Sequence, residues 1–349
     1  MKPRTFTWHR TLTFLTALLV LFTLLPFSLL SCGDEPEDST TPLRFAALSG
    51  PTGMGLAKLI SDVRAEGYSG RYQYVEFTDE QTAVSSAYAS PAVAANDLLS
   101  GKLDVAALDT VTAAKLAKQS NGAFRVLAIN TLGVLYVVEN GNTVTDLASL
   151  SGKTVAVPQR GGAPDFIFRY LLARNQIANV NIDYYSDPTA LASAVTGGEV
   201  SIAVLPEPKV SQVCTGDVRV ALNLSDIWGS SDPNLPLTQG CLVVRTEFAD
   251  AHPLLLNQFL ADYAASVAYI TEPTRLEEAA SLIASAGIIP KAPLAKKALP
   301  RANIVCITGE DMETKLTAFY RALYEFDPSI LGGSMPDESL FYIGANPTK

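Results

Sequence analysis

Histidine is scarce in this chain, whose 349 residues include only two. His9 falls in an N-terminal targeting segment, and His252 stands before Pro253 at a predicted helix start, a position typical of a surface or capping residue. A Ser–His or Cys–His catalytic pair would need that one side chain. The chain also lacks the Gly-x-Ser-x-Gly turn of serine hydrolases. These absences argue against an enzyme.

Cysteine is also rare, and its spacing predicts no metal site. The four cysteines form no Cys-x-x-Cys pair and no Cys/His ligand pattern, so no metal or other cofactor is expected. Cys214, Cys241 and Cys306 follow Cys32. An exported chain can form one disulfide, for which Cys214 and Cys241 are the first candidates because they flank a loop-rich stretch. The alternative is three small buried residues.

The chain has one long apolar run, at its N-terminus. Lys2, Arg4 and Arg10 accompany an uncharged apolar segment, 11–30, which is followed by Ser31 and Cys32. This order predicts a secretory signal over residues 1–31. A cysteine directly after a small residue resembles a bacterial lipoprotein signal, which implies lipidation of Cys32. The alternative is an uncleaved anchor, since the run is about long enough to span a bilayer. Both interpretations place the remaining chain outside the cytoplasmic membrane.

The remainder of the chain is acidic. Residues 32–42 contain four acidic residues among Ser, Thr and Pro, which predicts a flexible tether. The 318 residues from Cys32 onward carry 23 basic and 35 acidic side chains, a net charge of −12. That charge argues against binding nucleic acid or lying flat on anionic lipid. The length allows one large or two medium domains.

One nine-residue pattern occurs twice. The segment GKLDVAALD at 101–109 returns as GEVSIAVLP at 198–206. Each copy predicts a glycine that ends a helix, a short turn and a buried strand. Ligands of open α/β sheets bind outside the carboxyl ends of the strands. The repeat therefore predicts two similar lobes, each of which offers a loop to a ligand held between them.

Alternating strands and helices predict an α/β fold with mostly parallel sheets. The expected strands are 43–48, 72–77, 105–108, 124–130, 135–139, 154–158, 182–185, 202–205, 218–223 and 241–245; the expected helices are 54–66, 91–101, 110–120, 164–175, 189–196, 252–272, 274–286 and 311–326. The last three helices form a C-terminal tail. We expect a discontinuous first lobe, 43–131 with 223–349, a second lobe, 132–222, and a hinge of two crossing strands.

The order of these motifs resembles the solute-binding proteins of ABC importers, in the class that includes nitrate, sulfonate, taurine and thiamine-precursor binders. The resemblance is carried by the lipobox cysteine, the acidic tether, SGPTGMG at 49–55, GKLDVA at 101–106, NTLGVLY at 130–136, LSGKTV at 150–155, GGAP at 161–164, LPEP at 205–208 and GCLVVR at 240–245. It implies a type II periplasmic-binding fold whose two lobes close on a small molecule. It also implies delivery of that molecule to a membrane permease driven by a cytoplasmic ATPase.

The first lobe offers two candidate binding loops. Ser49, Gly50, Thr52 and Gly53 open a helix, where glycines let a backbone approach a ligand and free N–H groups favour an anion. The alternative is a plain strand–helix turn. Asp109 and Thr110 follow the first copy of the repeat, where Asp109 can contact a ligand, cap the next helix, or do both.

The second lobe offers the matching loops. Gln159, Arg160, Gly161 and Gly162 follow a strand, and Arg160 is the cation expected to face the cleft, unless it is a solvated loop residue. Glu207 follows the second copy of the repeat and can accept a hydrogen bond from a ligand, although a carboxylate in a first helical turn is ordinary. Trp228 is expected in a loop, 226–239, as an aromatic wall of the pocket or as a packing anchor.

We therefore expect a monomeric, lipid-anchored extracytoplasmic receptor without enzymatic activity. It would capture a small organic anion or a polar heterocycle for an ABC permease. The alternatives are an enzyme on the same fold that acts on a thiamine-precursor-like molecule, and a sensor or adhesion lipoprotein without a transport role.

Overall fold

The structure is a computed structural model that describes residues 40–78, 85–230 and 235–344. The predicted signal over 1–31, Cys32 and most of the tether over 32–42 lie outside the described residues. Within the described part, no helix combines the length and the apolar character that a membrane crossing requires.

The first of two larger sheets has six strands in the order β13-β6-β12-β5-β1-β2. β1 pairs in parallel with β2 and β5, whereas β12 runs antiparallel to β5 and β6, and β13 runs antiparallel to β6. The strand bounds are β1 Leu43–Ala46, β2 Tyr72–Tyr74, β5 Val105–Asp109, β6 Phe124–Leu132, β12 Thr238–Arg245 and β13 Ile304–Ile307.

The second sheet has five strands in the order β11-β7-β10-β8-β9. β8 pairs in parallel with β9 and β10, and β7 runs antiparallel to β10 and β11. The strand bounds are β7 Leu135–Asn140, β8 Thr154–Pro158, β9 Asn181–Tyr185, β10 Ile202–Pro206 and β11 Val218–Asn223. A small separate ribbon pairs β3 Phe77–Thr78 with β4 Ser85–Ser86.

Both larger sheets are mixed, whereas the sequence predicted mostly parallel ones. The chain leaves the first sheet at β6 and enters the second at β7, then leaves at β11 and returns at β12. These four strands supply the antiparallel pairs. The strands that alternate with helices pair in parallel. The strands through which the chain crosses from one sheet to the other run in the opposite direction and pair antiparallel.

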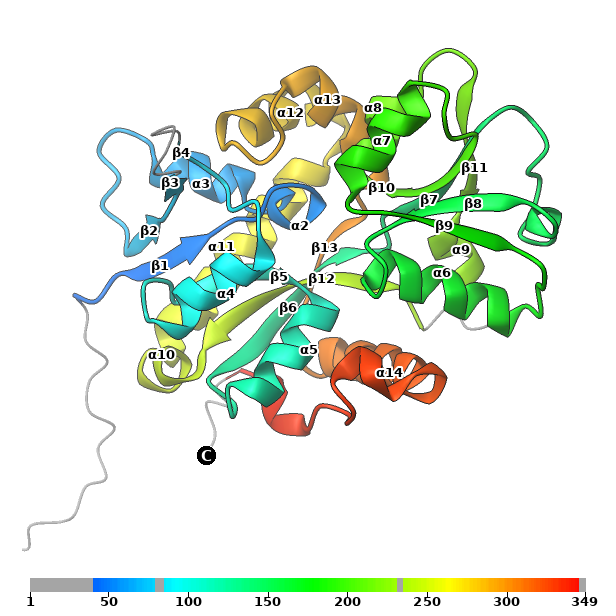
Figure 1. Cartoon of the computed structure of the whole chain (residues 1–349). Helices are drawn as coiled ribbons and strands as arrows, with labels where there is room; N and C mark the ends of the chain where they lie inside the picture. The colour runs from blue at the N-terminus through cyan, green and yellow to red at the C-terminus, as the bar shows by residue number, and fades with distance from the viewer. Residues whose placement is uncertain (1–39, 79–84, 231–234, 345–349) are drawn as a thin grey trace, which may run out of the picture. The chain divides into compact units, whose positions relative to one another are not determined.

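Helices cover both faces of each sheet (Figure 1). α3 and α11 lie on one face of the first sheet and α4, α5 and α14 on the other, while α6 and α9 lie opposite α7 and α8 on the second. The helix bounds are α2 Pro51–Met54, α3 Ala57–Val63, α4 Pro91–Leu99, α5 Thr110–Gln119, α6 Ala163–Arg174, α7 Pro188–Thr196, α8 Lys209–Val213, α9 Leu224–Gly229, α10 Thr246–Ala251, α11 Pro253–Thr271, α12 Leu276–Ser285, α13 Ala292–Ala298 and α14 Gly309–Phe326. Short 3₁₀ turns are η1 Ala148–Leu150, η2 Pro273–Arg275, η3 Leu299–Arg301, η4 Pro328–Leu331 and η5 Glu338–Leu340.

The repeated sequence pattern forms the same structure twice. Gly101 ends α4 with φ 76° and Gly198 ends α7 with φ 77°. The amides of the two residues after each glycine donate to one helix carbonyl, that of Asp97 in the first copy and Ala194 in the second. The strands that follow, β5 and β10, each lie between one parallel and one antiparallel neighbour. The repeat is therefore confirmed as one unit present in both sheets.

Three local expectations differ from the structure. The helix expected over 54–66 is observed only as α3, and a separate short helix, α2, precedes it; between them lies Gly55, where an added Cβ would lie 2.7 Å from the hydroxyl of Tyr263. The expected loop around Trp228 begins with α9. Cys214, Cys241 and Cys306 are free thiols, and no disulfide joins the first two. Cys241 lies inside the first sheet, whereas Cys214 follows α8 beside the second.

Candidate functional site

The predicted loops meet in pairs at the carboxyl ends of parallel strands. β1 and β5 are parallel neighbours, so the loops that begin at Ser49 and Asp109 share one edge of the first sheet. β8 and β10 are parallel neighbours in the second sheet and bring together the loops at Gln159 and Glu207. Each sheet thus presents two candidate loops at the edge where ligands of α/β proteins bind.

The loop after β1 is tightly fastened to its surroundings. The amide of Ser49 donates to Tyr88 O at 2.8 Å and that of Gly50 to Ile288 O at 3.0 Å. Gly53 has no room for a side chain, since an added Cβ would lie 1.9 Å from the carbonyl oxygen of Leu48. The amide of Gly53 also donates, to Gly50 O at 3.1 Å, so three of the amides that the sequence offered to a ligand are occupied, whereas Ser49 is exposed.

Asp109 and Thr110 are both engaged at the start of α5. Asp109 Oδ1 accepts from the amide of Thr112 at 2.8 Å, so Asp109 caps the helix, although its side chain is only partly buried. Thr110 is fully buried, and its hydroxyl donates to Thr238 O at 2.8 Å. The side chain of Thr110 is thus turned into the protein.

The turn after β8 is held by a buried carboxylate that the sequence analysis did not identify. Asp165 accepts from the amide of Gly161 at 2.8 Å, from Arg169 Nε at 2.9 Å and from the hydroxyl of Tyr184 at 2.9 Å. Gly162 can hold no side chain there, because an added Cβ would lie 2.9 Å from Gln159 O. An acidic residue in the first turn of a helix was the available signal, but such residues are common at helix starts.

Arg160 projects from that turn and is exposed. Its guanidinium carbon lies 5.2 Å from the ring centroid of Tyr184, a cation–π arrangement. Burial, followed by the hydrogen bond to Asp165, raises the pKa of Tyr184, so this ring stays neutral. Gln159, also exposed, adopts a left-handed φ of 57° beside it. In this turn the exposed cation of Arg160 therefore lies over the neutral ring of Tyr184.

Glu207 is buried in an ion pair between the two sheets. Its Oε1 accepts from Arg301 Nε at 2.6 Å and from the hydroxyl of Ser211 at 3.1 Å. Arg301 belongs to η3, just before β13 of the first sheet. The side chain of Glu207 has no exposed surface. Its acceptor oxygens are thus engaged by the protein.

Trp228 lies in the core. Its ring centroid is 4.6 Å from that of Tyr170 on α6 and 5.5 Å from that of Phe319 on α14, and the residue is fully buried. Trp228 thus links a helix beside the second sheet with a helix beside the first. This is the packing role that the sequence analysis gave as the alternative to a pocket wall.

A buried polar junction ties the first loop to the strands that connect the sheets. Asn130 Nδ2 donates to Thr52 O at 3.0 Å. A Cβ added at Gly240 would lie 2.4 Å from Thr52 Cγ2 and 2.5 Å from Asn130 Oδ1. Gly240 is therefore required for the close approach of α2 to β6 and β12.

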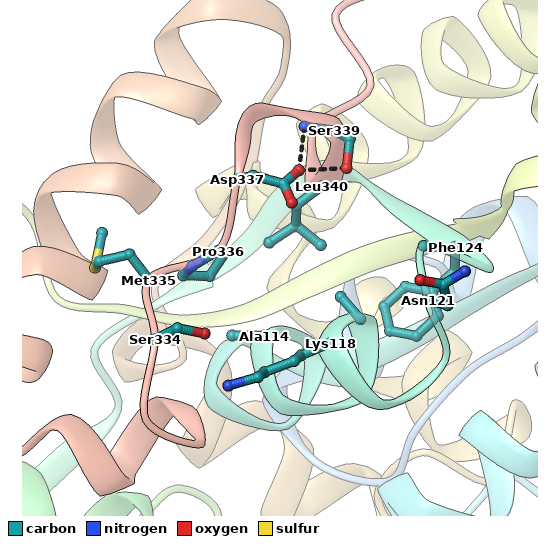
Figure 2. A pocket seen from close by; sticks show the side chains of 12 residues that line it. Ala114, Lys118, Asn121, Phe124, Ser334, Met335, Pro336, Asp337, Ser339 and Leu340 are labelled. Carbon is teal, nitrogen blue, oxygen red and sulfur yellow. Dashed lines mark hydrogen bonds between the residues drawn. The ribbon is translucent and has the colours of Figure 1, made fainter.

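Two other cavities lie away from the predicted residues. One, of about 330 Å³, lies between the end of α5 and the segment 334–340, and Lys118, Asn121, Ser334 and Asp337 are among the residues that line it (Figure 2). The other, of about 580 Å³, is an apolar groove between α3 and α11. None of the predicted ligand residues lines either cavity.

Two α/β units joined by crossing strands, with loops at the carboxyl ends of their parallel strands, define a type II periplasmic-binding fold. A model of the NMT1-like family matches residues 76–284, more than half of the chain, and the chain belongs to this family. No curated protein matches its sequence.

Solved structures show the same fold. An ABC transporter from Parabacteroides distasonis has 20% sequence identity, a TM-score of 0.70 and coverage of 86% of this chain and 99% of its own. The periplasmic aliphatic sulphonate-binding protein SsuA from Escherichia coli has 17% identity, a TM-score of 0.66 and coverage of 89% and 93%. The periplasmic nitrate-binding protein NrtA from Synechocystis has 15% identity, a TM-score of 0.51 and coverage of 78% and 75%.

Proposed function

We propose that this protein is the extracytoplasmic solute-binding component of an ABC importer, which captures a small organic anion or a polar heterocycle between two lobes. In this proposal the lobes are 43–131 with 223–349, and 132–222. Closure on the ligand shifts the population toward the form that the permease recognises. Cys32, lipidated after removal of residues 1–31, would hold the protein at the membrane as a monomer on the tether 32–42.

The observation that carries the proposal is the pairing of candidate loops at equivalent strands of two sheets. β5 and β10 are equivalent strands of the repeat, and each is followed by a candidate loop. In this proposal the side chains of Ser49, Thr52 and Asp109 contribute from the first sheet, and those of Gln159 and Arg160 from the second. We leave out Thr110, Glu207 and Trp228, because their polar groups or rings are engaged within the protein.

The similar structures support this class of function. Two of the three are binding proteins by name, for aliphatic sulphonates and for nitrate, and the third is named an ABC transporter. Both named ligand types are small anions, which agrees with an exposed Arg160 at the candidate site. An enzyme on this fold is the less supported alternative, since His252 packs on Phe248 between α10 and α11, with ring centroids 4.7 Å apart.

A thermal-shift screen tests the proposal. Alkanesulfonates, nitrate, small carboxylates and aminopyrimidines would be added to the purified chain, since a compound that binds only the native state raises the melting temperature. Arg160→Ala should reduce the shift given by an anionic hit, whereas Arg321→Ala, which removes an exposed arginine of α14, should leave it unchanged. Turnover of a hit by the wild-type protein would instead favour the enzyme.

The anchor requires a separate test. Cys32→Ser should release the mature protein from the membrane fraction of cells that express it, and mass spectrometry of the wild-type protein should find a lipid on Cys32. A sensor or adhesion role would be favoured if no permease and ATPase genes lie beside this one.

A further inference from the structure

Asp165, in the first turn of α6, joins the two groups that flank Arg160. Its Oδ2 accepts from the amide of Gly161, the residue that follows Arg160, at 2.8 Å. Its Oδ1 accepts from the hydroxyl of Tyr184 at 2.9 Å, and the ring centroid of Tyr184 lies 5.2 Å from the guanidinium carbon of Arg160. One carboxylate therefore holds both the backbone after Arg160 and the ring beside its side chain.

Asp165 is itself fixed by Arg169. Arg169 Nε donates to Asp165 Oδ1 at 2.9 Å, and the side chain of Asp165 is only 2% exposed. The guanidinium carbon of Arg169 lies 5.3 Å from the ring centroid of Phe166 and 5.8 Å from that of Phe326, which belongs to α14 beside the first sheet. Residues of both α/β units thus hold Arg169, and through it they hold Asp165.

Arg160, by contrast, has no polar anchor of its own. Within the parts of the chain that the structure describes, its side chain makes no hydrogen bond and no ion pair, and Tyr184 is the group that it contacts through a cation–π interaction. A long side chain that rotates freely loses conformational entropy when it binds a ligand, and a prepositioned one loses less. The position of Tyr184 and Gly161 should therefore affect how tightly Arg160 can hold an anion.

We propose that Asp165 is a positioning residue of the solute site, which sets the affinity for an anionic solute through Arg160 without contacting the solute. This inference rests on the proposed solute-binding function and makes its anion binding depend on a buried residue outside the candidate ligand contacts. Asp165 has the same sign of charge as such a solute, but its pairing with Arg169 keeps that charge engaged within the protein.

Titration calorimetry on the mature chain tests the inference, with pentanesulfonate and benzoate as anionic probes. Asp165→Asn keeps the size of the side chain but loses its charge and one of its two acceptor oxygens. It should weaken binding of either probe by about 10-fold, which is about 1.4 kcal/mol. The loss should disappear in the Arg160→Ala background, because a residue that acts only through Arg160 then has nothing to position.

Glu139→Gln is the matched control for lost stability. Glu139 is another buried carboxylate of the second unit, paired with Arg219 at 2.6 Å. It lies opposite Ile202 at the start of β10, whereas the turn at Arg160 follows the end of β8, which runs parallel to β10. Glu139→Gln should therefore destabilise the protein but change the affinity for a probe by about 2-fold at most, as expected of distant sites.

Tyr184→Phe is a milder variant that keeps the inference testable if Asp165→Asn does not fold. It removes only the hydroxyl that donates to Asp165 and keeps the ring beside Arg160. We expect a loss of affinity smaller than that of Asp165→Asn but larger than that of the Glu139→Gln control.

A measurement without ligand separates this inference from the proposed function. The Nε–H resonance of Arg160 in a nitrogen–proton NMR spectrum, assigned by its absence in Arg160→Ala, is sensitive to the ring of Tyr184. Asp165→Asn should shift this resonance, and Glu139→Gln should leave it in place.

Each outcome decides for or against the positioning role. A loss of affinity in Asp165→Asn that vanishes without Arg160, with affinity kept in Glu139→Gln, supports it. Wild-type affinity in both Asp165→Asn and Tyr184→Phe, an equal loss in Glu139→Gln, or an undiminished loss without Arg160 overturns it. If folded wild-type protein binds neither probe, the proposed anion binding fails. In that case a shifted Arg160 resonance in Asp165→Asn supports the positioning role alone, and an unshifted one overturns it as well.

Discussion

Arg301 and Glu207 form an ion pair between segments that belong to different sheets, with Nε and Oε1 2.6 Å apart. The backbone oxygen of Arg301 also accepts from the hydroxyl of Tyr136, on β7 of the second sheet, at 3.0 Å. Burial raises the pKa of Tyr136 to about 12, so this donor keeps its proton at neutral pH. The turn at Arg301 therefore fastens the two sheets beside the strands that cross between them.

Breaking this contact should destabilise the protein. Arg301→Gln leaves a carboxylate with no exposed surface without its cation. Removing one partner of a buried pair costs 3–5 kcal/mol; because the side chain of Arg301 is 37% exposed, we expect a smaller loss, about 2–3 kcal/mol in urea unfolding. Glu207→Gln, which removes the charge and keeps the shape, should cost less. An Arg301→Gln protein within 0.5 kcal/mol of wild type would show that the pair adds little.

Asp104 in the first copy of the repeat should contribute far more to the free energy of unfolding than its counterpart Ser201 in the second copy. Asp104 has no exposed surface and accepts from Arg44 at 2.8 and 2.9 Å and from Arg245 at 3.0 Å. Asp104→Asn should lower the free energy of unfolding by about 2–3 kcal/mol, because charge-assisted bonds are lost to a buried site. Ser201 is exposed, and Ser201→Ala should stay within about 0.5 kcal/mol. Similar losses in both variants would contradict this account.

Most strands and helices could be predicted because the residues that start and end them lie within or beside the element itself. Pro91 marked the start of α4, and Gly101 its end. The direction of β7 and β12 was not predictable in this way, since it depends on which sheet each strand enters. α13 and β13 were missed for a similar reason: they are short, with seven and four residues, and depend on packing against other parts of the chain.

The candidate loops could be located from the sequence, but the partners of their side chains could not. Glu207 looked like a free acceptor because its partner, Arg301, is 94 residues away in the chain. Thr110 likewise donates to Thr238, 128 residues away. Whether these loops bind a solute remains a prediction.

Stability should fall at acidic pH partly through Glu139. Burial alone would raise the pKa of Glu139, but hydrogen bonds from Thr143 and Val144 and the charge of Arg219 outweigh it and lower the pKa below its ordinary value. A depressed pKa contributes stability that is present above the unfolded value, about 4.3, and is lost as pH falls through the folded value. The unfolding free energy of wild type should therefore exceed that of Glu139→Gln at pH 7, and the difference should shrink below about pH 4.3. Glu278→Gln removes one charge at an exposed position and therefore serves as the control. A difference in unfolding free energy between wild type and Glu139→Gln that stays constant from pH 7 to pH 3 would contradict the prediction.

Gly240 should be intolerant of even a methyl group. An added Cβ would meet Thr52 Cγ2 at 2.4 Å and Asn130 Oδ1 at 2.5 Å, so α2 must move away from the strands. Gly240→Ala should cost about 1–3 kcal/mol in chemical denaturation, as overpacking does, and should weaken any ligand that uses the loop after β1. Gly229 is the matched control, because nothing lies within 4 Å of its added Cβ in α9. Gly229→Ala should be neutral or stabilising, since alanine favours a helix; a Gly240→Ala protein of equal stability would show that α2 is not fixed by this contact.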